Sequence, residues 1–497
     1  MASLSLSSLA ALVLIGLPVA MQAQSGSSTE QLPPKTWVDK DTGHRVWRVS
    51  DEPNSGAYYF NVNAYTPDLK QMVYNSPQGI RVLDLATMKT SLLVPNPPPP
   101  ANPDNSPMAR FGRGAHAIVV GHKTNSVFFS RIDPDTHKNA LYKANTNTGE
   151  VHKLIDLPVR LGIVSVNADE TLGAGTYNES DVPGGDPNAP NAFVASTSPP
   201  PGAANANAAS NLGGAHVQAD DKGQMMERRL AARIPLVLFT IRLEPGPNGE
   251  KPGLIKPLLH STDWVNHLLF SPKDPDLLMY CHEGPWQLVD RIWIIRADGT
   301  RNTLVHKRTM FMEITGHEFW SNDGKSVWYD WQFPKGQVYF LAGYEVATGH
   351  RVAYNMTPNQ WSIHFNGSRD HSVFAGDGGD SGQVTQAPDG TWIELYHLEA
   401  LGRHEGFNTP DLIQPGVLRS EHLVNMANHN YKLEPNERFS PDDKEIIFTS
   451  NMFGPSYVFA VEAGKAVNPP TDEVLSTPAL AEGFSPKPPP TPFSDQW

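Results

Sequence analysis

The sequence predicts an all-β protein, a seven-bladed β-propeller closed by an N-terminal strand in its last blade. A short polar tag of the type Ser-Pro-Asp-x-Lys recurs between apolar runs, at 65–70, 121–125, 167–171, 270–275, 320–325, 366–370 and 439–444. Most tags precede a short run of β-forming residues, at 71–74, 126–129, 276–280, 326–329, 372–374 and 445–448. A unit of about four short strands that repeats every 45–50 residues or so is typical of a propeller blade. Each tag is therefore expected to form the hairpin between the first and second strands of a blade.

The closure of the ring is predicted from two distant segments. The last repeat has only three candidate strands, because 457–461 is followed by a proline-rich tail. The sequence Thr-Gly-His-Arg-Val occurs at 42–46 and again at 348–352, where the outermost strand of the fifth repeat should begin. We therefore predict that residues 45–49 form the outer strand of blade seven, which removes the exposed edges of an open ring.

The propeller is expected to span residues 36–465. Residues 1–23 are predicted to be a secretory signal peptide, since the apolar stretch 4–19 is short and ends near Ala-Met-Gln-Ala at 20–23. That stretch lacks a preceding Lys or Arg, so an uncleaved membrane anchor stays as the alternative. A disordered insert is expected at about 181–221, followed by a helix-prone stretch at 225–233 and strand 236–240, and the tail 466–497 is expected not to pack.

Composition limits the classes of function. A net charge of −13 without a basic stripe argues against nucleic-acid binding, and no membrane partner is expected. An anionic substrate would therefore need a locally basic cleft. The single Cys281 excludes an intramolecular disulfide, so export would fit a periplasmic or secreted location in bacteria. The sequence does not indicate an oligomeric state.

Histidines recur at one position of the repeat. His267, His317 and His364 each precede a tag by a similar distance, and His429 precedes the last tag. The first strand of every propeller blade lines the central channel, so equivalent positions form a ring. One buried histidine is usually a hydrogen-bonded core residue, but three at one level predict a metal site or an acid/base site.

A second motif, His-Glu-Gly-Pro-Trp at 282–286, precedes Asp290 and Arg291. It fits either a tight turn or a sugar-binding cleft, in which Trp286 would stack on a sugar ring and an arginine would bind a carboxylate. The candidate sources of positive charge are Arg291, Arg113 and Lys432. A serine nucleophile is not indicated, and a thiol nucleophile at Cys281 beside His282 would need spatial pairing that sequence adjacency does not provide.

These motifs resemble the oligogalacturonate lyases, a polysaccharide lyase family on a seven-bladed propeller. The similar segments lie within about residues 36–463 and include 227–233, 282–286, 290–293, 316–320, 361–364, 376–379 and 450–455. The resemblance implies β-elimination on short α-1,4-linked galacturonate oligomers, assisted by a divalent metal, typically Mn²⁺. It also implies that His317 is the catalytic base, that Arg291 is the nearby arginine and that His364 is a metal ligand.

The chain departs from the family in blade seven. Family members commonly show Gln-x-x-His-x-His-Pro there, whereas this chain has His429, Lys432 and Glu434 at the corresponding positions. The metal site is therefore expected either to be rebuilt from His364, His429 and Glu434 or to be lost, with Lys432 as a fixed cation in its place. His267, His282, Trp286, Arg113 and Lys432 are the candidate substrate-binding residues. Two other classes stay open, a non-catalytic Tol-type propeller that binds proteins and a lyase for another uronate-containing glycan.

Overall fold

The computed structural model describes residues 32–97, 114–193, 219–402 and 412–475. The chain divides into two compact units, Met1–Pro33 and Pro34–Trp497, and every described helix and strand lies in the second. The predicted signal peptide and Arg113 lie outside the described residues. The predicted all-β class is confirmed, because the described part of the chain consists mainly of strands, with one α-helix, α3 (Ala219–Ala232). None of the helices in the described part is long and apolar enough to cross a membrane.

The first three groups of antiparallel strands lie between residues 71 and 261. They consist of β3 (Gln71–Ser76), β4 (Gly79–Asp84) and β5 (Lys89–Pro95); of β6 (His116–Val120), β7 (Ser126–Ile132), β8 (Asn139–Asn145) and β9 (Val151–Asp156); and of β10 (Ser165–Val166), β11 (Leu172–Asn178), β12 (Leu236–Arg242) and β13 (Ile255–Ser261). A short 3-10 helix, η1 (Glu179–Asp181), follows β11.

The next groups carry most of the candidate residues. They consist of β14 (Trp264–Phe270), β15 (Leu277–Glu283), β16 (Ile292–Arg296) and β17 (Thr303–Leu304); of β18 (Ile314–Trp320), β19 (Ser326–Gln332), β20 (Tyr339–Glu345) and β21 (Arg351–Met356); and of β22 (Phe365–Gly367), β23 (Val373–Gly376), β24 (Trp392–Ala400) and β25 (Gln414–Asn425). The last two groups are joined into one sheet by parallel pairing of β21 with β25. Two 3-10 helices, η2 (Trp286–Leu288) and η3 (Pro358–Gln360), interrupt the connections.

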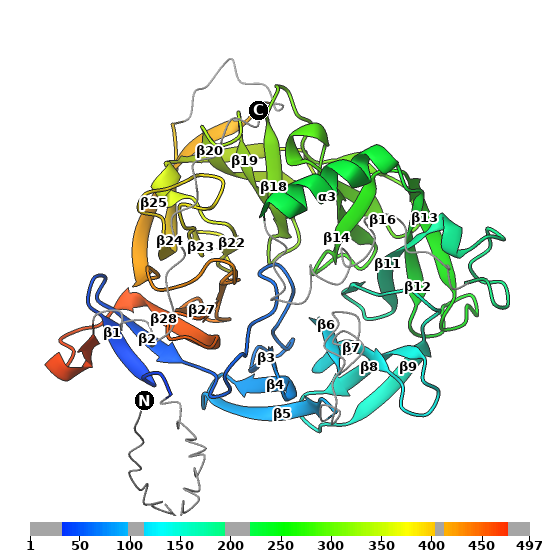
Figure 1. Ribbon diagram of the computed structural model, residues 1–497, viewed down its shortest axis with the longest axis horizontal. Helices are drawn as coiled ribbons and strands as arrows, with labels where there is room; N and C mark the ends of the chain where they lie inside the picture. The colour runs from blue at the N-terminus through cyan, green and yellow to red at the C-terminus, as the bar shows by residue number, and fades with distance from the viewer. Residues whose placement is uncertain (1–31, 98–113, 194–218, 403–411, 476–497) are drawn as a thin grey trace, which may run out of the picture. The chain divides into compact units, whose positions relative to one another are not determined.

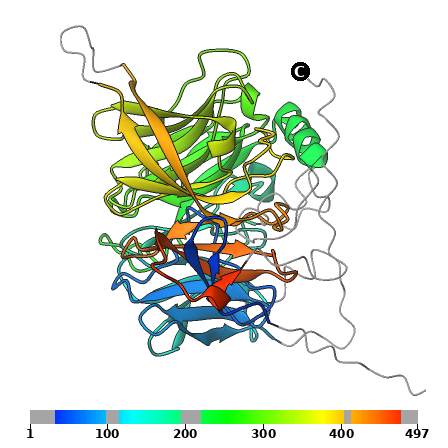
Figure 2. The ribbon, with the colours of Figure 1, turned by 90° about the vertical axis from the view of Figure 1, so that its left-hand side faces the viewer.

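The final sheet combines both ends of the described chain. It contains β26 (Arg438–Phe439), β27 (Glu445–Ser450), β28 (Tyr457–Lys465), β2 (His44–Arg48), β1 (Thr36–Asp39) and β29 (Val474–Leu475). Within this unit the sheets follow one another in chain order around a common centre (Figure 1). The side view shows α3 on one face of that arrangement (Figure 2).

The polar tags form the turns that directly precede β3, β7, β11, β15, β19, β23 and β27. In four of these turns a hydroxyl donates to the carboxylate two residues on, from Thr66 to Asp68, Ser321 to Asp323, Ser368 to Asp370 and Ser440 to Asp442. The same hydroxyl oxygen accepts from the first backbone amide after the turn, as Ser321 Oγ does from Ser326 N at 2.9 Å. The tag residues therefore satisfy backbone groups that a tight turn would otherwise leave unpaired.

The expected pairing of the N-terminal segment with the end of the chain occurs between β2 and β28, where Val46 is opposite Val461 and Arg48 is opposite Phe459. The sheet continues beyond β2, which corrects the prediction that this strand is the outermost one. β1 pairs with β2, and β29 pairs with β1 in parallel. The start of the tail 466–497 therefore packs, because Lys40 N donates to Leu475 O and Arg45 forms an ion pair with Glu473 at 2.9 Å.

The beginning of the expected disordered insert 181–221 also packs, which corrects that prediction for residues 181–193. Val182 is buried, and the Asn188 side chain bonds to both the amide and the carbonyl of Ile255, each at 2.8 Å. These bonds satisfy the first residue of β13, so the segment is fixed to the sheet. The helix predicted at 225–233 is present as α3, which begins earlier, at Ala219.

Candidate active site

Three histidines come together from neighbouring groups of strands. His267 is on β14, His317 is on β18 and His364 directly precedes β22. The rings of His317 and His364 lie 5.0 Å apart between centroids, and the ring of Tyr59 contacts His364 at 5.0 Å and His267 at 6.1 Å. Tyr59 comes from the connection that precedes β3, so the cluster joins segments about 300 residues apart in sequence.

Two of these histidines occupy unusual backbone positions. His267 has φ of 50° and His317 has φ of 49°, and the pairing register shifts at each, in β14 against β15 and in β18 against β19. A bulge with a left-handed residue turns its side chain out of the regular alternation. Non-glycine residues in this region carry strain, which is concentrated at functional sites in proteins. The repeated strain supports a functional assignment for His267 and His317.

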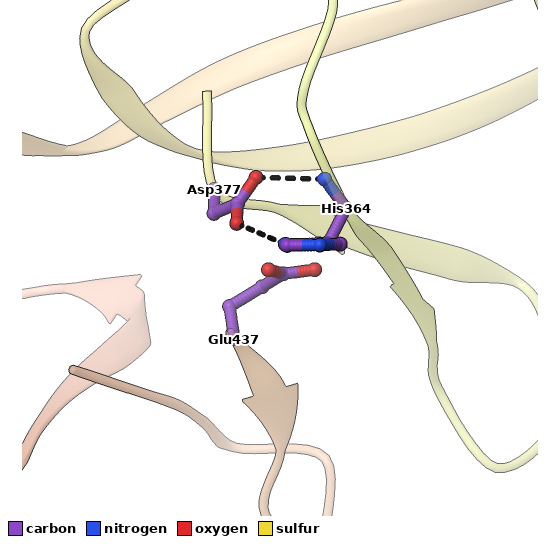
Figure 3. A group of neighbouring side chains, drawn as sticks. All are labelled: His364, Asp377 and Glu437. Atoms are coloured by element: carbon purple, nitrogen blue, oxygen red, sulfur yellow. Dashed lines mark hydrogen bonds and ion pairs between the residues drawn. The ribbon is translucent and has the colours of Figure 1, made fainter. Parts of the chain in front are cut away.

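His364 is fixed by Asp377, which follows β23. The backbone amide and Nδ1 of His364 both bond to the Asp377 carboxylate, at 2.8 and 2.7 Å (Figure 3). Nε2 of His364 therefore faces Tyr59 Oη at 3.2 Å and Glu434 Oε2 at 3.8 Å. Burial lowers the pKa of His364 to about 3, so the ring is neutral at neutral pH. A neutral imidazole can ligate a metal ion through either ring nitrogen, and Asp377 lies at Nδ1.

Glu437 completes a fully buried acidic cluster. Ligand atoms of His364, Asp377 and Glu437 all lie within 4.8 Å of one another, and Figure 3 shows the Glu437 carboxylate beside the imidazole. Burial raises the pKa of Asp377 to about 7, and burial together with Asp377 raises the pKa of Glu437 well above its usual value. Neither carboxylate oxygen of Glu437 has a hydrogen-bond donor in the described part of the chain. One imidazole nitrogen and several carboxylate oxygens, grouped so closely, are a donor set that fits a divalent cation of the Mn²⁺ class.

His317 is placed between a carboxylate and an indole. Its Nδ1 lies 3.3 Å from Asp330 Oδ1, and its ring contacts Trp286 edge-to-face at 5.0 Å. Trp286 reaches this position because residue 316 is glycine, since a Cβ there would come within 2.5 Å of the indole. The side chain of His317 is 15% exposed, so a substrate can reach it. A histidine that is oriented by a buried aspartate in this way suits proton abstraction.

Arg291 supplies a buried positive charge beside His267. Its guanidinium lies 4.3 Å from the centre of the Trp286 ring, and Nη1 bonds to Glu283 Oε1 at 3.3 Å. Glu283 Oε2 also lies 3.0 Å from Nε2 of His267. Burial alone would lower the pKa of Arg291, but the surrounding anionic groups raise it. Arg291 is therefore a permanent cation at the site.

The structure places several sequence candidates elsewhere. His282 lies next to Trp293 and 3.9 Å from Asp263, apart from the histidine cluster. Lys432 is exposed and forms no ion pair with the described residues. Burial raises the pKa of the Cys281 thiol, which is the opposite of what a thiolate nucleophile requires.

In the predicted metal set of His364, His429 and Glu434, the ring of His429 is engaged by other groups. His429 Nε2 donates to the carbonyl of Leu433 at 2.7 Å, and its Nδ1 lies 3.0 Å from the Ser450 hydroxyl. Both ring nitrogens therefore already have partners. Glu434 does lie beside His364, but the buried acidic groups next to that histidine are Asp377 and Glu437.

Sequence reasoning missed Tyr59, Asp330, Asp377 and Glu437. Asp377 lies in the similar segment 376–379, whose glycines indicate a loop at the channel mouth rather than a buried acid. Gly378 has φ of +66°, and a Cβ there would come within 2.4 Å of backbone oxygens, so the glycine permits the close packing that buries Asp377. Tyr59 carries no local signal in the sequence.

The known proteins to which this chain is similar include oligogalacturonate lyases. A family model described as oligogalacturonate lyase matches residues 249–467. An oligogalacturonide lyase of Pectobacterium atrosepticum is 25% identical over 224 residues, 43% of this chain and 54% of the relative. An oligogalacturonate lyase of Dickeya dadantii is 28% identical over 229 residues, 44% of this chain and 54% of the relative. The match thus spans about half the length of these curated relatives.

Two solved structures share the fold over most of the chain. An oligogalacturonate lyase in complex with manganese superposes with a TM-score of 0.61 at 19% identity, covering 87% of this chain and 97% of that one. An oligogalacturonate lyase from Vibrio parahaemolyticus gives a TM-score of 0.60 at 18% identity, with the same coverage. Structural likeness at such identities establishes the fold, whereas the family model rests on sequence. Residues 249–467 of this chain are therefore similar in sequence to the oligogalacturonate lyase family.

Proposed function

We propose that this protein cleaves short α-1,4-linked galacturonate oligomers by β-elimination. The observation that carries the proposal is the juxtaposition of His317, backed by Asp330, with the buried cation Arg291 and the oriented His364. All four residues lie in the segment that matches the family model. A scaffold that only binds proteins has no need for ionisable groups buried together at one level.

His317 is the proposed base. Because Asp330 faces Nδ1, Nε2 can accept the proton from C5 of the uronate. The electron pair of the broken C5–H bond forms the C4–C5 double bond, and the C4–O bond breaks. The leaving oxygen takes a proton, so the products are an unsaturated sugar and a shortened oligomer with a free hydroxyl. General-base catalysis of this kind contributes roughly 10²–10⁴-fold.

Arg291 is the proposed partner of the substrate carboxylate. The C5 proton is weakly acidic because the adjacent carboxylate is anionic, and negative charge grows on that group as the proton leaves. A fixed guanidinium in a water-poor site stabilises this charge without reorganisation. Trp286 holds the Arg291 side chain by stacking, and Glu283 orients one edge of it.

His364, Asp377 and Glu437 would hold a divalent cation, with Mn²⁺ as the proposed metal. The related structure in complex with manganese supports this choice, as does the donor set of one imidazole and two carboxylates. When bound, the cation supplies positive charge that neutralises the buried carboxylates and polarises the uronate carboxylate. Glu434, 3.8 Å from His364, lies at the edge of this site.

We also propose the finer points of architecture and location. The groups of antiparallel strands would be the seven blades of one ring, closed where β2 pairs with β28. Export to the periplasm or the exterior, by way of residues 1–23, would place the enzyme where acidic oligosaccharides from pectin arrive. The acidic oligosaccharide is then the partner, and neither a nucleic acid nor a membrane is required.

The test is incubation of the purified protein with a panel of uronic oligosaccharides, followed by absorbance of the unsaturated product. Galacturonate oligomers should give product, and excess EDTA should reduce the rate, with recovery on adding Mn²⁺. Product from another uronate alone would keep the lyase chemistry but replace the substrate. Absence of product from every oligomer, with Mn²⁺ present, would favour the protein-binding scaffold.

A further inference from the structure

Helix α3 carries a buried arginine that the proposed chemistry does not use. Met226 and Arg229, three residues apart, lie on the same face of α3. Met226 packs in the apolar cluster that contains Trp264, and the Arg229 guanidinium lies 4.4 Å from the centre of the Trp264 ring. Arg229 is only 6% exposed. Its charge is therefore largely removed from water.

No anion compensates this charge among the described residues. Arg229 forms no ion pair there, and its Nε is buried without a hydrogen-bond partner. Burial lowers the pKa of Arg229 to about 10, which reflects the cost of the charged form. A cation–π contact offsets only part of the cost of burying a charge. Arg233, one turn further along, is different, because it forms an ion pair with Asp263.

The strand register places Arg229 close to the candidate active site. Trp264 is paired directly with Glu283 across β14 and β15. Directly opposite residues project from the same face of a sheet, with Cβ atoms about 4.5–5.5 Å apart. Glu283 in turn holds His267 and Arg291. Arg229 and Glu283 therefore both lie next to Trp264.

Two arginines thus stack on two tryptophans at adjoining positions. Trp286, beneath Arg291, packs against the same apolar cluster as Trp264, beneath Arg229. Stacking occupies a face of the guanidinium and leaves its edge, which carries the N–H donors, for an anion. A planar edge of this kind binds a carboxylate with two parallel hydrogen bonds.

We propose that Arg229 binds the carboxylate of a second uronate, adjacent in the oligomer to the one held at Arg291. This subsite rests on the proposed function, because galacturonate oligomers carry one carboxylate per sugar. It gives the acidic chain the locally basic cleft that its net charge does not provide. The consequence is a requirement for at least two neighbouring free carboxylates in the substrate.

The test compares Arg229→Met, which keeps an unbranched chain on Trp264, with the wild type. The probes are digalacturonate and its two mono-methyl esters, one at each carboxyl group. Loss of a bidentate ionic contact should raise KM for digalacturonate about 10- to 100-fold, with little change in kcat. The wild type should bind one of the two mono-esters as weakly as Arg229→Met binds free digalacturonate. Arg229→Met should bind the two mono-esters equally. Arg229→Lys, which keeps the charge without the fork, should lie between them.

Arg233→Gln is the matched control, since it removes an ion pair just after the end of α3 without touching Arg229. It should leave KM within about threefold, the range of an exposed pair. Calorimetric titration of digalacturonate into His317→Ala reads binding without turnover, so it tests the subsite even if the wild type proves inactive. Equal ester discrimination by wild type and Arg229→Met would overturn the subsite. Failure of the wild type to cleave any oligomer, with the Arg229-dependent binding intact, would instead overturn only the proposed reaction.

Discussion

A buried carboxylate in the amino-terminal half and two in the candidate active site differ in how they are satisfied. In the amino-terminal half, Glu170 accepts bonds from Lys123 N, Thr124 N and the Thr124 hydroxyl, at 2.6 to 3.0 Å. In the half that matches the family model, Asp377 and Glu437 face each other around His364 with raised pKa values. Burial and residue type are alike in the two places. The supply of donors differs, because neither carboxylate oxygen of Glu437 has a hydrogen-bond partner among the described residues.

The largest effect is expected from His317→Ala. Turnover of galacturonate oligomers should fall about 10²–10⁴-fold, because the variant removes the base while Asp330 stays in place. The measurement is kcat from the absorbance of the unsaturated product, alongside a circular dichroism melt. Glu170→Gln is the control from the other half, and it should lower the melting temperature while kcat of the folded fraction stays unchanged. Equal losses of kcat in His317→Ala and Glu170→Gln would contradict the assignment of catalysis to the candidate active site.

Glu437→Gln should weaken metal binding by at least about 10- to 100-fold, as the loss of ligand support does in metal sites. The wild type should melt at a higher temperature when Mn²⁺ is added after chelation, and this rise should be lost in the variant. His429→Gln distinguishes the two possible ligand sets, because the ring nitrogens of His429 are engaged by Ser450 and Leu433. A manganese response that disappears in His429→Gln and persists in Glu437→Gln would restore the ligand set predicted from sequence.

The sequence predicted the fold better than the site because the two depend on different ranges of interaction. The tags and β-forming runs are local, and they located the first hairpins at β14–β15 and β18–β19 within a residue or two. The repeat position of His267, His317 and His364 follows from the same periodicity. Glu437 stands two residues before its tag, as Glu318 does, so the repeat carried a signal that the sequence reasoning did not use. Tyr59 lies outside the tags, and only the packing of distant groups brings it to His364.

The pH dependence of stability at Glu313 tests the behaviour of a buried carboxylate that has its hydrogen-bond donors. Although burial opposes its ionisation, bonds from His306 and Thr309 lower the pKa of Glu313 to about 2. A lowered folded-state pKa contributes stability above the unfolded value of about 4.5, and that stability is lost as pH falls toward 2. At about 1.4 kcal/mol per pKa unit this is up to roughly 3 kcal/mol. Urea unfolding at pH 7 and pH 3 should show that Glu313→Gln is destabilised at pH 7 and approaches the wild type at pH 3.

Glu437→Gln should behave in the opposite way in the presence of EDTA. Its raised folded-state pKa means that the stability of the wild type is present below about 4.5 and lost as pH rises through the folded value. The variant should therefore gain stability relative to the wild type as pH rises. If the stability of Glu313→Gln and of Glu437→Gln, each relative to the wild type, changed in the same direction with pH, the distinction between carboxylates with and without hydrogen-bond donors would be wrong.

The smallest effect is expected from Lys432→Ala, which decides whether a lysine has replaced the metal in the segment that precedes β26. Lys432 is exposed, and its backbone amide donates to Asn430 Oδ1 at 3.1 Å within the loop. Exposed charges contribute about 0–1 kcal/mol, so KM for galacturonate oligomers should rise less than about fivefold and kcat should stay unchanged. If the Lys432 ammonium instead paired with the substrate carboxylate in place of a metal, its removal would abolish turnover. EDTA would then have no effect on the rate of the wild type. Kinetics of Lys432→Ala with and without EDTA therefore separate the two arrangements, because a metal-dependent enzyme loses rate to EDTA equally with either residue at this position.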